Sequence, residues 1–173
     1  MFRELALGAA GAVAVVCAAS AHVTLETREA PVGAPYKAVL RVPHGCDGAA
    51  TTALRVRIPE GMIAVKPMPK PGWKIDTVSG KYPKTYSFFH GAKLSEGVTE
   101  VSFSGGVLPD AYYDEFVLTG FLAGDLEPGT TLYFPVVQEC EKGVNRWIEI
   151  PAAGKSSGDY AEPAPALKLL PKP

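Results

Sequence analysis

Alternation of apolar and polar residues is the dominant pattern between positions 22 and 151. The clearest case is the segment A-L-R-V-R-I-P, in which Leu54, Val56 and Ile58 point to one side and Arg55 and Arg57 to the other. Apolar residues recur with a period of two far more often than with the helical period of about 3.6. Proline or glycine also interrupts the chain too often for long helices. The pattern predicts an all-β chain.

Short segments with this alternation are separated by turn residues about every ten positions. The predicted strands are 22–27, 36–42, 52–58, 62–66, 73–78, 85–89, 98–104, 114–122, 131–137 and 146–150. Strands of this length and spacing suit a two-sheet β-sandwich of the immunoglobulin or fibronectin-III type better than a closed barrel. The pattern leaves the order of the strands open.

The first 21 residues have the features of a cleaved signal peptide. Arg3 provides a basic start, an apolar run extends from Leu5 to Ala19, and the segment A-S-A at 19–21 fits the small-residue cleavage rule. The apolar run is shorter than the roughly 20 residues that a membrane span needs. We therefore expect a periplasmic or otherwise extracytoplasmic protein whose mature chain begins at His22.

Composition divides the remainder into a domain and a tail. Residues 22–151 form one expected domain, whereas residues 152–173 are rich in proline, alanine and serine and are expected to be disordered or loosely docked. The chain carries 17 basic and 18 acidic residues, so its net charge is close to zero. This balance argues against nucleic acid as a partner.

Three cysteines occur in the chain, and one of them, Cys17, leaves with the signal peptide. Cys46 and Cys140 remain as an even pair in an oxidising compartment, which predicts one disulfide bond. The competing interpretation, two metal-binding thiolates, lacks any C-x-x-C spacing.

A histidine at the start of the mature chain offers two nitrogen ligands on one residue. Its α-amine has an ordinary pKa near 8, and the imidazole Nδ1 can close a chelate ring on the same ion. Nitrogen and oxygen donors in a square plane favour Cu(II). On an unbroken strand Glu26 would share the face of His22 but lie roughly 13 Å away. Glu29 stands just before a bend expected at Ala30–Pro31, so strand parity selects neither carboxylate as a third ligand.

With these residues in hand, the mature chain resembles the YcnI family of exported copper-binding domains. The segments that carry the resemblance are A-H-V-T-L, R-E-A-P-V-G, L-R-V-P-H-G-C, I-P-E-G, P-M-P-K-P-G-W, S-G-G-V-L-P-D, Y-D-E-F, Y-F-P-V-V-Q-E-C and R-W-I-E-I-P. The resemblance implies a β-sandwich that holds one Cu(II) in a mono-histidine brace at His22. It also implies Glu29 as a further ligand and Trp147 as an aromatic neighbour of the metal. Cys46 and Cys140 occur in only part of that family.

Several alternatives stay open at this point. Trp73 competes with Trp147 for the aromatic role, and His44 and His90 are candidate remote ligands. We expect a copper-trafficking or copper-homeostasis protein with no turnover of its own, working with a second periplasmic copper chaperone or a copper transporter. The alternatives are a copper-dependent oxidative enzyme of the polysaccharide-cleaving type, which would need a second histidine, and a metal-free ligand-binding sandwich.

Overall fold

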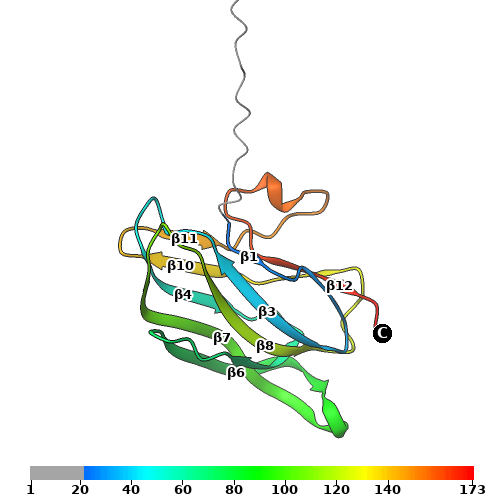
Figure 1. The fold of residues 1–173 in the computed structure, drawn as a ribbon. Helices are drawn as coiled ribbons and strands as arrows, with labels where there is room; N and C mark the ends of the chain where they lie inside the picture. Colours follow the sequence, from blue (N-terminus) through cyan, green and yellow to red (C-terminus); the bar gives the residue numbers. More distant parts are fainter. Residues whose placement is uncertain (1–21) are drawn as a thin grey trace, which may run out of the picture.

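The computed structural model describes residues 22–173, and the expected signal peptide at 1–21 lies outside the described residues. Two antiparallel sheets form the body of the molecule, and a smaller sheet accompanies them (Figure 1). The first sheet has the order β1-β3-β8-β5, formed by Thr24–Leu25, Pro35–Val42, Asp114–Leu122 and Met62–Pro67. The second has the order β11-β10-β4-β7-β6, formed by Val144–Trp147, Val136–Cys140, Thr51–Arg57, Lys93–Leu108 and Lys74–Ser87. The third has the order β2-β12-β9, formed by Glu29–Pro31, Ala166–Leu170 and Thr131–Tyr133.

The core lies between the two large sheets and confirms the predicted β-sandwich. In β4, Leu54 and Val56 are fully buried while Arg55 and Arg57 are exposed, as the alternation predicts. Phe103 of β7 packs against a residue of the opposite sheet, Phe116 of β8, with 5.1 Å between ring centroids. The residues that alternation places inward therefore meet in one apolar layer.

One long hairpin replaces three predicted segments. The segments 73–78 and 85–89 merge into β6, and 98–104 extends to β7, with a 3-10 turn η1 at Phe89–Gly91 between the two strands. The middle of β6 alternates poorly because most of its side chains are exposed. Backbone pairing rather than burial holds this stretch, and the ladder is interrupted between Lys81 and Tyr86, where Pro83 has no N–H to donate.

The predicted strand 131–137 is in fact two strands in different sheets. β9 ends at Tyr133 and pairs with β12, while β10 begins at Val136 and pairs with β4 and β11. Phe134 and Pro135 separate them, and the side chain of Phe134 is fully buried. Proline cannot continue a hydrogen-bonded ladder, which explains why the chain changes sheets here.

The C-terminal segment corrects the expectation of a loosely docked tail. Ala166–Leu170 forms β12, which pairs parallel with β2 and antiparallel with β9. Leu167 and Leu169 are fully buried in the core. The prolines on both sides of A-L-K-L-L hid this short alternating strand. The other 3-10 turn, η2 at Ser157–Asp159, precedes β12. Within residues 22–173 no helix is long and apolar enough to cross a membrane.

The predicted disulfide bond is confirmed. Cys46 lies in the loop between β3 and β4, Cys140 ends β10, and the two sulfur atoms are 2.03 Å apart. The bond closes a sequence separation of 94 residues. It ties the β3–β4 loop to the end of β10, the strand that pairs with β4.

Candidate metal centre

The first described residue, His22, lies against the indole ring of Trp147. The ring centroids are 5.4 Å apart and the planes are tilted by 59°. β1 begins beside β11 at one end of the sandwich (Figure 1), and Trp147 is the last residue of β11. Trp147 is only 4% exposed, whereas His22 is partly exposed. The imidazole is therefore accessible from solvent and backed by a buried aromatic wall.

A buried amide, Gln138 of β10, fixes the orientation of that indole. Trp147 Nε1 donates a hydrogen bond to Gln138 Oε1 at 2.9 Å. Gln138 Nε2 donates to the backbone oxygen of His44 at 2.7 Å and is 2.8 Å from Thr51 Oγ1. Gln138 is 1% exposed, so these bonds satisfy an amide that would otherwise be costly to bury. Gln138 is not among the residues predicted from the sequence, because its partners lie on the neighbouring strands β11 and β4 and in the β3–β4 loop.

The disulfide bond touches the same network. Cys46 Sγ lies 3.9 Å from the backbone oxygen of Gln138, and Cys140 Sγ lies 3.9 Å from Thr51 Oγ1. Both sulfur atoms of the bridge therefore contact the residues that surround the side chain of Gln138, which in turn orients Trp147 beside His22.

Glu29, the carboxylate that the family resemblance implies as a ligand, makes its ion pair elsewhere. The chain bends at residues 26–28, before the Ala30–Pro31 position where a bend was expected, and Glu29 opens β2. Its carboxylate lies 3.4 Å from Lys168 Nζ on β12, with both side chains more than half exposed. No ion pair of residues 22–173 joins Glu29 to His22. The described residues also contain no group of three or more His, Cys, Asp and Glu side chains placed to hold a metal ion.

The Glu29–Lys168 pair is nevertheless a weak restraint. Exposed ion pairs contribute about 0 to 1 kcal/mol, because water screens the charges and both side chains lose freedom. The carboxylate of Glu29 can thus leave Lys168 at small cost. Glu26, the other candidate, is exposed, and its backbone N–H donates to the oxygen of Val39, which prolongs the pairing of β1 with β3.

Trp73 occupies a different place in the molecule from Trp147. It packs edge-on against Phe116, with 4.9 Å between centroids, and joins the border of the main core. A methyl group at Gly106 would lie within 2.3 Å of the Trp73 ring, so the indole rests directly on that glycine. The structure therefore places Trp147 at His22 and gives Trp73 a packing role.

The two remaining histidines, His44 and His90, lie outside the strands. His44 Nδ1 is hydrogen-bonded to the backbone oxygen of Gly45. His90 sits in the turn η1 with φ of 55°, a left-handed conformation. Neither ring stacks on His22 or Trp147 among the aromatic contacts of the described residues.

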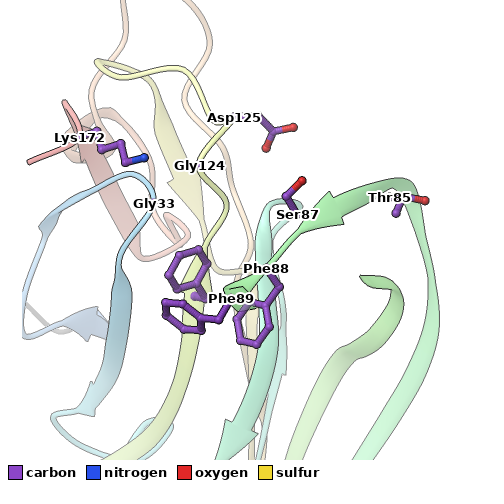
Figure 2. Close-up of a pocket in the computed structure, with 9 residues that line it drawn as sticks. Gly33, Thr85, Ser87, Phe88, Phe89, Gly124, Asp125 and Lys172 are labelled. Atoms are coloured by element: carbon purple, nitrogen blue, oxygen red, sulfur yellow. The ribbon is translucent and has the colours of Figure 1, made fainter. Parts of the chain in front are cut away.

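A cavity of about 400 Å³ is lined by an aromatic cluster far from β1 in the sequence. Figure 2 shows Phe88 and Phe89 gathered at its centre, with Lys172 and Asp125 farther out. Phe88 and Phe89 both pack on Phe121, with centroid distances of 5.5 and 4.8 Å. Its polar members offer no convergent set of metal ligands, so this cavity is the weaker candidate.

A comparison with protein families matches residues 22–169 to a domain of unknown function, DUF1775. The chain belongs to the DUF1775 family. The match extends through most of β12, in agreement with the docking of that strand. No curated protein matches the chain at a significant level.

This DUF1775 chain is also similar to a solved structure with an immunoglobulin-like fold. That structure is the crystal structure of an uncharacterized protein from Nocardia farcinica, which is 27% identical. The similarity covers 87% of this chain and 99% of the other, with a TM-score of 0.60. It supports the immunoglobulin-like architecture and carries no statement of function.

Proposed function

We propose that this DUF1775 domain binds one Cu(II) at a processed N-terminus and carries the ion in the periplasm or another extracytoplasmic space. The observation that carries the proposal is the juxtaposition of His22 and Trp147. The residue that signal peptidase would expose lies against a buried indole whose orientation is fixed by Gln138. The resemblance to the YcnI copper-binding domains supports the same function.

Cleavage supplies the second nitrogen ligand. In the precursor the backbone nitrogen of His22 is an amide bonded to Ala21, and amides are poor ligands at neutral pH. Removal of residues 1–21 would convert it to an amine with an ordinary pKa near 8, which loses its proton readily to a metal ion. The amine and the imidazole together form a chelating pair that suits Cu(II). Trp147 would shield one side of the ion, and Glu29 would supply an oxygen ligand after leaving Lys168.

A carrier fits these residues better than an oxidative enzyme does. Oxidative polysaccharide cleavage requires a second histidine to complete three nitrogen ligands. Within residues 22–173 neither His44 nor His90 joins His22 in a group of side chains placed to hold a metal ion. We therefore propose transfer of copper to a second chaperone or a transporter, with no turnover at His22.

Three versions of the protein test the proposal: the mature chain beginning at His22, the same chain with its α-amine acetylated, and a mature chain with His22→Ala. The mature chain should bind one equivalent of Cu(II), with two nitrogens visible in electron paramagnetic resonance. Each altered chain should bind at least about a hundredfold more weakly, because one chelating nitrogen is lost. Equal affinity in the acetylated chain would contradict the proposal. Peroxide release or oxidised sugars under reductant would favour the enzyme instead.

A further inference from the structure

A small cavity of about 260 Å³ opens directly beside His22. Its lining residues are His22, Thr24, Arg28, Arg41, Pro43 and Tyr113. Two of the six carry a guanidinium group, and none carries a carboxylate. The cavity is therefore positively charged on the side that faces the candidate metal centre.

Arg41 of β3 is held in place by contacts with both neighbouring strands and with Tyr113. It pairs across the sheet with Thr24 of β1 and with Glu115 of β8. Its Nε lies 3.5 Å from Glu115 Oε1, and its guanidinium carbon lies 5.8 Å from the centre of the Tyr113 ring. These contacts orient the guanidinium group and leave its terminal nitrogens available as donors.

Arg28 approaches the cavity from the bend between β1 and β2. Its Nε donates a long hydrogen bond of 3.4 Å to the oxygen of Leu25. None of the ion pairs found in residues 22–173 includes Arg28. Four of its five N–H groups are thus free of the Leu25 contact, and its charge is not matched by a carboxylate.

A copper dication at His22 would add further positive charge beside two guanidinium groups, of which Arg41 is paired with Glu115 and Arg28 is not. Like charges at short range repel, and the repulsion would weaken metal binding unless an anion lies between them. Cu(II) also takes donors beyond the two nitrogens of His22. One bound anion would meet both requirements.

We propose that this cavity binds a small carboxylate, held by Arg28 and Arg41 next to His22. A planar guanidinium group matches a carboxylate in two parallel hydrogen bonds, so the two arginines suit a dicarboxylate. In the copper-loaded protein the carboxylate completes the coordination of the metal; that part of the inference rests on the proposed function. The volume lies below the usual range of about 300 to 1,000 Å³ for ligand pockets, which limits the ligand to a small acid or to one acidic side chain of a partner.

Titration of the metal-free mature protein with succinate at low ionic strength tests the cavity alone. Succinate should bind, and succinamide, which has the same shape without charge, should not. The substitutions Arg28→Gln and Arg41→Gln should each lower the association constant by about tenfold or more. The control is Lys37→Gln, which removes one positive charge from the same strand as Arg41 and should change nothing. Arg28 is exposed, so its variant tests the proposal even if Arg41→Gln is poorly folded.

A second titration separates the two sources of the carboxylate and the two proposals. A terminally blocked Glu-containing peptide that binds more tightly than succinate would identify a partner side chain; tighter succinate would identify a free acid. Copper loading should strengthen succinate binding and alter the electron paramagnetic resonance spectrum. Succinate binding that depends on the arginines, in a protein that binds no copper, would refute the proposed function and leave the proposal of a carboxylate-binding cavity standing. Absence of succinate binding, or equal losses in Lys37→Gln and the arginine variants, would overturn the inference.

Discussion

The two ends of the sandwich each have a cavity, and they differ in the residues that line and support it. The aromatic end, formed by Phe88, Phe89 and Phe121, has the larger cavity, at about 400 Å³ against about 260 Å³ beside His22. Yet its rings pack mainly on one another, and its acidic residue Asp125 is already paired with Lys84 at 2.9 Å. Volume alone therefore does not distinguish a site.

The His22 end has the smaller cavity and the richer support. An accessible imidazole lies on a buried indole, the indole donates to a buried amide, and the amide is bonded to the loop that the disulfide closes. The hydrogen bonds of Gln138 fix the orientation of the Trp147 indole relative to the loop that contains His44. The His22 end therefore differs from the aromatic end in having an exposed donor backed by satisfied buried polar groups.

Removing the disulfide bond, which lies at the His22 end, should have the largest effect on the unfolding free energy. The double substitution Cys46→Ser and Cys140→Ser frees a loop of 94 residues, and the chain-entropy estimate for that length is about 4 to 5 kcal/mol of unfolding free energy. Denaturant titration followed by tryptophan fluorescence measures the loss. A loss below about 1 kcal/mol would show that the bridge does little for stability.

Replacing Gln138 with leucine should give the next largest effect. The change leaves Trp147 Nε1 and the backbone oxygen of His44 without their partner, at a cost of about 1 to 3 kcal/mol for each group that water cannot reach. Cu(II) affinity should fall with stability, because the indole loses its fixed orientation. Thermal melts and copper titration measure the two effects.

Phe89→Ala provides the matched control at the aromatic end. Phe89 is 51% exposed, so its truncation should cost little stability, and Cu(II) affinity should stay unchanged. If Phe89→Ala weakened copper binding as much as Gln138→Leu, the contrast between the two ends would be wrong.

The sequence predicted the sandwich, the disulfide and the neighbour of His22 for different reasons. Alternation in segments such as β4 follows from burial on one face, so the main strands could be found without a structure. The disulfide followed from an even cysteine count, and Trp147 came only from the family resemblance. Gln138, Arg28 and Arg41 could not be found this way, because their roles depend on which strands become neighbours.

The predicted strand boundaries were wrong in two places, at the C-terminus and in the β6–β7 hairpin. β12 was missed because its five residues stand among prolines, although Leu167 and Leu169 fill the core. The β6–β7 hairpin was longer than predicted because its outer half has little apolar alternation to detect. Register and sheet membership depend on contacts between distant segments, which a local pattern does not contain.

A tyrosine beneath the aromatic end should make stability depend on pH in alkaline solution. Burial, together with the nearby charge of Glu60, raises the pKa of Tyr86 to about 12 from its ordinary value near 10. The native state therefore favours the neutral phenol, and this stability is present below pH 10 and lost as pH rises toward 12. Tyr86→Phe should flatten the fall in unfolding free energy across that window. Burial also raises the pKa of Tyr36, so part of the slope should remain. An unchanged slope would contradict this assignment.

The smallest effect on stability should come from Lys168→Gln, yet this change tests the candidate copper ligand most directly. The exposed pair with Glu29 contributes about 0 to 1 kcal/mol, so the unfolding free energy should hardly change. If Glu29 binds copper, the mature Lys168→Gln protein should bind Cu(II) severalfold more tightly. Glu29 then has no ion pair to break, and one positive charge near the metal is removed. Glu29→Gln should lower the affinity and remove any benefit of Lys168→Gln in the double variant. An affinity that is unchanged in all three variants would exclude Glu29 from the coordination sphere, and the oxygen ligands would then have to come from the anion held by Arg28 and Arg41.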